Sequence, residues 1–499
     1  MNLEELSKEF EQSKAESDFS EPRTMKELED KIYQAGELWR AENTTINEKK
    51  GKKTVPLPSH GVVAKYLIKL CQFTFIGKGG RTDNSPLYVY NLDTGLYTFS
   101  QDLLNRLCYK FDPRLKSTHV KESLLVIRTK TKMRLPFDNP NLIPVANGVF
   151  NKKTHKLEPF SPSYIITAKI KTAYNEEASK PILGGWFDFE RWLESIACDD
   201  EEIVTLLWQV MDEAINPNRT RNKMAILYGE GNNGKGTFQS LLVNLIGMEN
   251  IATLKPDQFK DYHPSTLEGK VANIGDDISN KFLDDVSDLM SIVSGDPITV
   301  NPKMQKPYEA TFKLFCLFSG NDLPRARNKS QGWYRRLCII PFNADFNGQK
   351  ERPEIKREFL KDKKLLEWVL YKILNMADFE TFIEPKAVSD VLESYKKDND
   401  YTVAFIVDDY MARDLHLVRR VPLTWIKEEY ITFLEMNDLQ QHIPYGFGKG
   451  FVKSLADQTG GTYILKKGRM GKKDVEEFPE LLTDTKYVGN TDNLVVKQK

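Results

Sequence analysis

The sequence predicts an α/β protein with several domains. Its 499 residues are enough for about three domains at roughly 100–200 residues each. Residues 222–343 contain short apolar runs (MAILY, VANIG, FKLFCLF and LCIIPF) that alternate with helical or loop segments. Runs of this length and composition are typical of the buried strands of a parallel sheet. We therefore expect an α/β core in the middle of the chain.

The composition excludes several classes of protein. Hydrophobic residues make up 40% and charged residues 28%, as in folded rather than disordered chains. Lys+Arg and Asp+Glu both number 71, so any attraction to nucleic acid must come from a local basic surface. No run of 18 apolar residues predicts a membrane span, and the acidic start lacks the apolar core of a signal peptide. We expect a cytoplasmic protein with no membrane partner.

The cysteines also favour a cytoplasmic protein. They are odd in number and contain no CxxC pair, which argues against a zinc ribbon and against a disulfide scaffold. This usage fits a reducing cytosol. The five are Cys71, Cys108, Cys198, Cys316 and Cys338.

The pattern along the chain predicts the remaining elements. YVYNLDTGLYTF (88–99) and ANGVFNKKTHKLEPFSP (146–162) each predict a hairpin, and the apolar spacing of 187–215 predicts two helices broken near Asp199. We expect, in order, a charged helical segment with its linker, an α+β N-terminal domain, a helical collar, the α/β core, a linker, a small helix-and-wing domain and a polar tail, at residues 1–58, 59–183, 184–221, 222–393, 394–410, 411–475 and 476–499.

The strongest motif is a phosphate-binding loop. Gly229-x4-Gly234-Lys235 follows an apolar strand and opens a segment with helical apolar spacing. The glycines let backbone N–H groups wrap a phosphate at a helix N-terminus, and the lysine adds a point charge. The expected ATP-binding residues are Gly229, Glu230, Gly231, Asn232, Asn233, Gly234, Lys235, Gly236, Thr237 and Phe238.

One position departs from this pattern. The usual Ser or Thr directly after the lysine is Gly236, and Thr237 comes next. Thr237 is therefore our candidate magnesium ligand, either directly or through water. The alternative is a Gly-rich turn that binds no nucleotide.

Two acids follow the next strand. VANIGDDIS (271–279) ends in Asp276-Asp277, and carboxylates at a strand end suit a magnesium shell and the activation of a water. We expect Asp276 to hold the metal shell and Asp277 to polarise the water. A helix N-cap is the alternative interpretation of such acids.

Two further signals complete the candidate catalytic set. Asn321 follows the run FKLFCLFSG, at the end of a predicted buried strand, and could hold the attacking water. The alternative is an Asn-Asp turn, which would give the same sequence pattern. Arg335 and Arg336 precede the run LCIIPF. An arginine that cannot reach its own loop can complete a neighbour's site, which implies a ring; the alternative is a solvated pair.

A basic hairpin is expected between the acids and Asn321. SGDPITVNPKMQKPYEATF (294–312) places Lys303 and Lys306 at a tip beside Tyr308. Lysines on such a hairpin could follow a DNA backbone without reading its sequence. The alternative is an ordinary exposed hairpin.

The C-terminal unit has a local basic excess. Residues 411–473 contain 11 Lys/Arg and 6 acids, with two predicted helices and a strand with a basic tip. This fits a winged helix that places one helix in a major groove and its wing, with Lys466, Lys467 and Arg469, on phosphates. The alternative is a winged helix that contacts only protein.

The order of these elements resembles superfamily 3 helicases of the AAA+ class, and more narrowly the helicase half of phage, plasmid and poxvirus-type primase-helicases. The matching stretches are GEGNNGKGT, ANIGDD, GDPITVNPKMQKPYEATF, SGNDLP and WYRRLCIIPF, and the two hairpins resemble the domain that precedes that helicase. The resemblance implies an AAA+ P-loop core, a hexameric ring, ATP and Mg²⁺ as cofactors, and 3′-to-5′ movement on single-stranded DNA.

The layout also resembles replication initiators of staphylococcal pathogenicity islands, which implies a mobile element in a bacterial host cell and origin recognition by the C-terminal domain. Asp398-Asn399-Asp400 and Ser117-Thr118-His119 stand in the wrong order for an archaeo-eukaryotic primase site. A separate primase and other replication proteins are therefore expected as partners.

The residues leave three functions to compare. The first is an ATP-dependent DNA helicase and replication initiator that binds single-stranded and origin duplex DNA. The second is an origin-binding or loader-type ATPase switch that does not unwind. The third is a small-molecule kinase, since Gly-Lys-Gly-Thr also occurs there, but Asn321, the two arginines and the extra domains argue against it.

Overall fold

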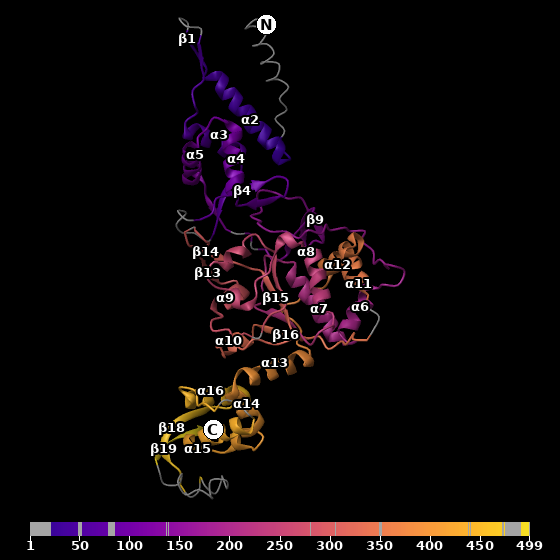
Figure 1. Cartoon of the computed structure of the whole chain (residues 1–499), viewed down its shortest axis with the longest axis vertical. Helices are drawn as coiled ribbons and strands as arrows, with labels where there is room; N and C mark the ends of the chain where they lie inside the picture. Colours follow the sequence, from indigo (N-terminus) through magenta and orange to yellow (C-terminus); the bar gives the residue numbers. More distant parts are fainter. Residues whose placement is uncertain are drawn as a thin grey trace.

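The computed structural model arranges the chain as three bodies along its long axis (Figure 1). The N-terminal domain lies at one end, the domain with the central sheet in the middle, and the C-terminal domain beyond helix α13 at the other end. The structure describes residues 21–47, 52–77, 85–135, 137, 139–279, 281–304, 306–348, 352–437, 439, 441–471, 474 and 491–498.

The N-terminal domain packs helices against a mixed sheet. Its helices are α2 (Met25–Glu42), α3 (His60–Leu70), α4 (Gln101–Phe111) and α5 (Ser117–Lys130). Its sheet has the order β5-β4-β3-β6, from Leu96–Thr98, Tyr88–Asn91, Phe73–Ile76 and Met133–Arg134.

The first segment differs from its expected role as a separate element. Met25, Leu28 and Ile32 of α2 are buried in one core with α3, α4 and α5, because their i, i+3, i+7 spacing gives α2 an apolar face. The expected linker also contains strand β2 (Lys52–Thr54), which pairs with β1 (Thr45–Asn47). The helix expected within residues 1–20 lies outside the described residues.

Both predicted hairpins and the predicted helix break are confirmed. The first hairpin joins β4 to β5, and a second sheet follows with β7 (Leu142–Val145), β8 (Gly148–Asn151) and β9 (Lys156–Glu158). Helices α6 (Phe189–Ile196) and α7 (Glu201–Ala214), in the segment expected to be a collar, are separated at Cys198 and Asp199, both with positive φ.

The central sheet is parallel throughout, as predicted. Its order is β11-β12-β15-β10-β16, from Ile251–Ala252, Ala272–Gly275, Phe315–Gly320, Met224–Tyr228 and Leu337–Pro341. Alternate residues of β10 enter two different cores: Ala225 and Leu227 face one, and Met224 and Ile226 face the other. Because both faces are buried, each strand has a nearly continuous apolar sequence.

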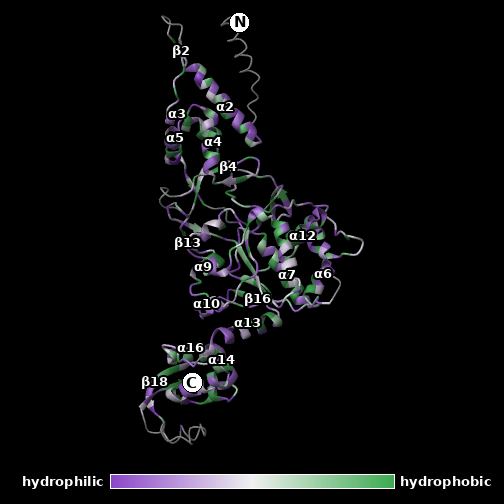
Figure 2. Cartoon of the chain, viewed as in Figure 1, coloured by the Kyte–Doolittle hydropathy of each residue, from purple (hydrophilic) through white to green (hydrophobic). Residues whose placement is uncertain are grey.

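Helices cover both faces of this sheet (Figures 1 and 2). α7, α8 (Lys235–Ile246) and α12 (Lys363–Asn375) contribute to the first core, α9 (Ser287–Ser294) contributes to the second, and α13 (Lys386–Asn399) contributes to both. Shorter elements are α10 (Gln331–Tyr334), α11 (Pro353–Arg357) and the 3-10 turns Met248–Asn250, Pro256–Gln258, His263–Leu267 and Phe359–Lys361.

The C-terminal domain combines helices with a three-stranded sheet. α14 (Tyr401–Phe405), the π-helix Ile406–Tyr410, the 3-10 turn Leu415–Leu417, α15 (Leu423–Met436) and α16 (Phe447–Thr459) pack on strands β17 (Arg420–Pro422), β19 (Thr491–Lys497) and β18 (Tyr463–Arg469). The sheet order is β17-β19-β18.

Two expectations for this region differ from the structure. The expected linker 394–410 is mostly helical, and its residues Phe405, Ile406 and Tyr410 are buried in the C-terminal core. The expected polar tail ends in β19, the middle strand of the sheet, with Leu494 and Val495 buried. Both errors arose because a short apolar run among polar residues gives a weak signal until its partner strands or helices are placed.

No described helix combines the length and the apolar character needed to cross a membrane.

Candidate functional site: a phosphate loop at the edge of the parallel sheet

The loop between β10 and α8 has the conformation that the motif predicts. Gly229 has φ +155°, and a Cβ there would lie 2.4 Å from the carbonyl oxygen of Phe342. Gly234 has φ +92°, and a Cβ there would lie 2.7 Å from Cγ2 of Ile196. Only glycine fits both positions, and α8 begins at Lys235, as predicted.

Lys235 is folded beneath this loop. Its ammonium donates hydrogen bonds to the carbonyls of Gly229 (2.6 Å) and Glu230 (2.7 Å), and to Oδ1 of Asn233 (3.1 Å). Burial lowers the pKa of Lys235, and nearby Asp276 partly opposes that effect. The loop therefore holds a cation whose partners are neutral oxygens, which an anionic oxygen could replace.

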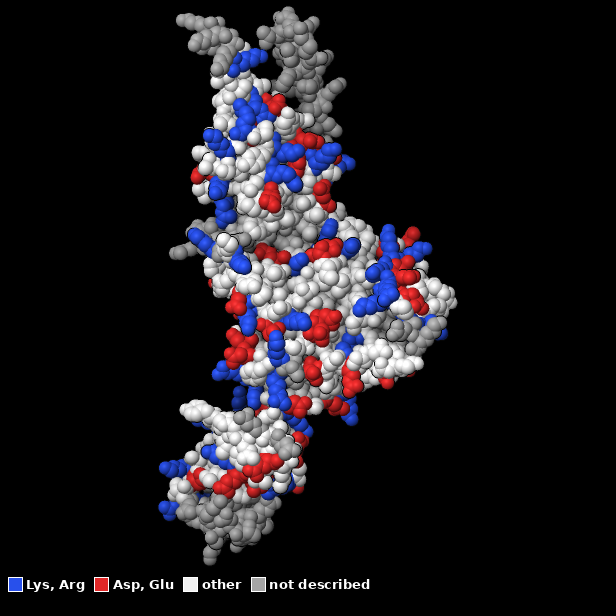
Figure 3. Space-filling view, viewed as in Figure 1, with Lys and Arg blue, Asp and Glu red and all other residues white. Residues whose placement is uncertain are grey.

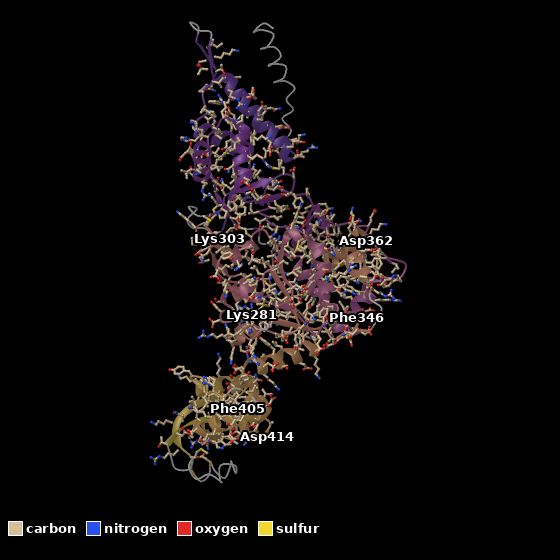
Figure 4. The ribbon with its side chains drawn as sticks, in the orientation of Figure 1. Lys281, Lys303, Phe346, Asp362, Phe405 and Asp414 are labelled. Atoms are coloured by element: carbon tan, nitrogen blue, oxygen red, sulfur yellow. The ribbon has the colours of Figure 1, made fainter. Side chains whose placement is uncertain are left out.

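A second segment braces the loop from outside. Nδ2 of Asn233 donates to the carbonyl of Phe342 (2.8 Å), and the Phe346 amide donates to the carbonyl of Asn232 (3.2 Å). Asn232 also donates to Oδ1 of Asn347 (3.2 Å). Figure 4 labels Phe346 in the part of the central domain where Figure 1 labels α6. Sequence reasoning missed this segment, because nothing in its residues shows that the chain returns to the loop after β16.

The two acids lie at the carboxyl end of β12, next to β15. Ser319 donates a 2.6 Å hydrogen bond from Oγ to Oδ1 of Asp276, and the same hydroxyl lies 3.0 Å from Oε1 of Gln239 on α8. Asp276 Oδ1 also accepts from the Asp277 amide (2.9 Å). Asp277 has φ +50°, and its carbonyl accepts from the ammonium of Lys255 (2.7 Å).

Ser319 and Gln239 were not among the predicted site residues. The available signal for Ser319 was a polar residue directly after the mostly apolar run FKLFCLF. Asn321 is exposed two residues further, at the same edge of the sheet, and Thr237 is half-buried in the first turn of α8. The structure thus brings the loop, Asp276 and the end of β15 together, since carboxyl ends of parallel strands share one edge.

The arginine pair is not equivalent. Arg336 is 8% exposed and donates from Nε (2.9 Å) and Nη2 (2.6 Å) to Oγ of Ser294, and from Nη1 to the carbonyl of Gly332 (2.5 Å). Arg335 is exposed. Arg336 is therefore committed within its own chain, which does not fit a residue that reaches a neighbouring subunit or a solvated pair. The exposed side chain of Arg335 is compatible with both interpretations.

The basic hairpin is present. Strands β13 (Pro297–Val300) and β14 (Tyr308–Thr311) pair antiparallel, and Lys303 and Lys306 are exposed in the connecting loop. Figure 4 places Lys303 on the side of the central domain nearest the N-terminal domain. Tyr308 is not at the exposed tip, because it is half-buried and its hydroxyl donates to Oε2 of Glu268.

The basic residues of strand β18 in the C-terminal domain are also exposed. Lys466, Lys467 and Arg469 lie on β18, and Nε of Arg469 donates to Oγ1 of Thr491 on β19 (3.0 Å). The two lysines at 472 and 473, counted in the basic excess, lie outside the described residues. Figure 3 shows both signs of charge interspersed on the face in view, consistent with the zero net charge.

Two family models match parts of the chain. Residues 89–198 match the family "D5 N terminal like", and residues 227–336 match a family of unknown function, DUF5906. The second match begins in β10 and contains the loop, the acids and the hairpin.

Two viral relatives are similar over a longer stretch. "Putative helicase 121R" of Invertebrate iridescent virus 3 is 23% identical over 320 residues, which cover 56% of this chain and 33% of the relative. "Putative helicase L207/L206" of Acanthamoeba polyphaga mimivirus is 24% identical over 330 residues, 60% of this chain and 33% of the relative. The chain is similar to viral proteins named as helicases. It spans about a third of the length of those relatives.

A solved structure titled "The A form apo structure of NrS-1 C terminal region-CTR" aligns over 89% of this chain and 100% of its own, with 10% identity and a TM-score of 0.48. A second structure of the same region aligns over 89% of this chain with 11% identity and a TM-score of 0.47.

Proposed function

We propose that this chain is an ATP-dependent DNA helicase that initiates replication of a mobile genetic element. The observation that carries the proposal is the phosphate loop of Gly229–Lys235 at the edge of a parallel sheet, with Asp276 held at the end of a neighbouring strand by Ser319. Similarity to viral proteins named as helicases supports the choice of DNA as the substrate of the motor.

The residues of this edge fit a magnesium-bound nucleoside triphosphate. Lys235 is cradled by three neutral oxygens that a phosphate oxygen could displace, and backbone N–H groups begin at the N-terminus of α8. The hydroxyl of Thr237 and the carboxylate of Asp276 supply the oxygen ligands that magnesium prefers. When bound, the metal would neutralise charge on the phosphates.

The remaining residues have distinct roles in the proposal. Asp277 polarises the attacking water, and Asn321 holds that water near the γ-phosphate. Arg335, exposed beside the buried Arg336, neutralises transition-state charge in the site of an adjacent subunit, which requires a homo-oligomeric ring, proposed as a hexamer.

DNA contacts are proposed at two places. The exposed Lys303 and Lys306 grip the backbone of a single strand during 3′-to-5′ translocation. The C-terminal domain, folded as a winged helix of an AAA+ superfamily 3 protein, reads origin duplex, with Lys466, Lys467 and Arg469 on phosphates. Priming falls to a separate primase, and the setting is the cytoplasm of a bacterial host.

The test is ATP hydrolysis with and without single-stranded DNA, followed by displacement of a strand from a forked duplex. We expect hydrolysis to rise with single-stranded DNA and the fork to open only with ATP. DNA-stimulated hydrolysis without displacement would favour the loader-type switch. Hydrolysis indifferent to DNA, in a chain that forms its oligomer, would contradict both.

A further inference from the structure

Two cavities meet where the N-terminal domain faces the basic hairpin. One has a volume of about 640 Å³ and the other about 430 Å³. Both volumes fall in the range of roughly 300–1,000 Å³ that is typical of ligand sites. Residues that line both cavities include Tyr88, Glu268 and Tyr308.

These three residues are joined by hydrogen bonds. The hydroxyl of Tyr88 on β4 donates to Oε1 of Glu268, and the hydroxyl of Tyr308 on β14 donates to Oε2. One carboxylate thus joins the N-terminal sheet to the hairpin. Both tyrosines line the cavities while their hydroxyls are held by Glu268.

The smaller cavity is lined by several aromatic side chains and reaches the start of the hairpin loop that carries the two lysines. Tyr88, Tyr97, Phe99 and Tyr308 line it, together with Pro302, which precedes Lys303; Tyr88 and Tyr97 are buried, so Phe99 and the half-buried Tyr308 supply its accessible rings. We call this cavity the aromatic cleft. The Phe99 side chain is 39% exposed, and its ring centroid lies 6.2 Å from that of Tyr88.

The acidic and basic side chains occupy different sides of the aromatic cleft. Inside, the acidic side chain is Glu268, whose two oxygens already accept hydrogen bonds from tyrosines. Outside, Lys303 and Lys306 are exposed on the hairpin, and the ammonium of Lys303 lies 5.9 Å from the ring of Tyr262, which is itself 47% exposed. The larger cavity has mixed charge, with Lys270, Lys313, Glu268 and Glu309 on its lining.

We infer that the aromatic cleft binds one unstacked base of the single-stranded DNA whose phosphates the hairpin lysines hold. Base stacking on aromatic rings needs a flat apolar surface and tolerates any base, whereas a phosphate would meet the carboxylate of Glu268. The base therefore points inward and the backbone outward. The N-terminal domain thereby becomes part of the DNA grip. This inference rests on the proposed function, since it assumes that single-stranded DNA passes the hairpin.

The experiment measures binding of the full chain to two fluorescent oligonucleotides in the presence of a non-hydrolysable ATP analogue. One is oligothymidine, and the other is an abasic strand of the same length and charge. Phe99→Ala removes the exposed ring of the cleft, and Tyr109→Ala is the matched control, because Tyr109 is 38% exposed on α4 and does not line either cavity.

The expected result is selective. Phe99→Ala should weaken oligothymidine binding about 5- to 100-fold and leave abasic binding within about twofold, since stacking contributes only when a base is present. Tyr109→Ala should match the unaltered chain on both strands. Lys303→Ala with Lys306→Ala should weaken both strands alike.

Other outcomes separate this inference from the proposed function. If Phe99→Ala binds both strands as the unaltered chain does, the aromatic cleft is not a base site, while the helicase proposal stands. If Phe99→Ala weakens the abasic strand equally, the cleft acts on the backbone and the inference is overturned. If the unaltered chain binds neither strand, the proposed function fails together with it.

Discussion

Ser319 donates a 2.6 Å hydrogen bond from its hydroxyl to Oδ1 of Asp276, and so links the ends of two neighbouring strands of the central sheet. The amide of Asp277 donates to the same oxygen at 2.9 Å. Two donors on one oxygen fix the orientation of the carboxylate. We therefore expect Oδ2 of Asp276 to be the oxygen that faces the magnesium shell.

Ser319→Ala should slow ATP hydrolysis without preventing ATP binding. A hydrogen bond to a charged group is worth roughly 1.5–3 kcal/mol, so a loss of about 10- to 100-fold in kcat is expected if the carboxylate loses its alignment. Steady-state hydrolysis and binding of a fluorescent ATP analogue measure the two effects separately. Ser287→Ala, at an exposed serine of α9, is the control. An equal loss of affinity would assign Ser319 to the nucleotide pocket instead.

Lys235→Ala should abolish ATP hydrolysis and leave the fold nearly as stable as before. The lysine contributes hydrogen bonds to two loop carbonyls, so its removal should cost little stability beyond the loss of those bonds. Hydrolysis assays and thermal unfolding, with Lys364→Ala on the exposed face of α12 as the control, test this. Retained turnover would remove the loop from the catalytic site.

Arg335→Ala and Arg336→Ala should both impair ATP hydrolysis, but for different reasons. Arg336→Ala removes bonds to Ser294 and Gly332, so it should lower the melting temperature. Arg335→Ala should melt normally and lack hydrolysis. Mixed with Lys235→Ala subunits, it should recover part of the activity, because some interfaces pair an intact loop with an intact arginine. Verified mixed oligomers without recovery would argue against an arginine acting between subunits.

Truncation after residue 400 should give a stable motor, whereas truncation after residue 410 should not. Oδ1 of Asn399 accepts from the amide of Ala326 (2.7 Å), so α13 belongs with the central domain. Phe405 and Ile406 are fully buried in the C-terminal core, and the longer fragment would expose them to water.

The two fragments are compared by light scattering, ATP hydrolysis and competition between origin and random duplex at two salt concentrations. The shorter fragment should hydrolyse ATP and lose the preference for origin, because it lacks the domain proposed to read origin duplex. Two salt concentrations are used because phosphate contacts weaken alike on all duplexes as salt rises, whereas base contacts preserve the preference ratio. If it keeps the full ratio, origin reading lies upstream of residue 400.

Asp212→Ala should destabilise the packing of helix α7. Asp212 is fully buried on α7, where Oδ1 accepts from the ammonium of Lys152 (2.6 Å) and Oδ2 accepts from Arg219. Removing it leaves the buried ammonium of Lys152 without its carboxylate and Arg219 with only Glu213 and Asp378, and breaking such a buried pair costs about 3–5 kcal/mol. Asp378→Ala, which removes a 67% exposed partner of Arg219, should cost about 1 kcal/mol or less. Chemical unfolding of both variants measures the difference, and equal losses would contradict the assignment.

The local chemistry of the candidate site could be predicted from the sequence. Three consecutive segments carry its signals. An apolar run predicts the strand, the glycines at 229 and 234 predict the loop, and helical apolar spacing predicts the helix from Lys235. The acids after β12 and the hairpin with Lys303 and Lys306 were predicted in the same way, since each depends on a few adjacent residues.

Contacts between distant elements were decided only by the tertiary structure. Tyr88 and Glu268 are 180 residues apart, and no local pattern shows that they meet. The same holds for Ser319 on Asp276 and for the different environments of Arg335 and Arg336.

The sequence by itself determined most of the strands and helices of the central domain and the position of the glycine-rich loop between β10 and α8, because periodicity and backbone preference are local. The tertiary structure decided which strand ends share an edge, that β19 pairs between β17 and β18, and that β4 faces the hairpin. Those relationships depend on how buried faces pack together, and a single strand or helix carries no record of its partner.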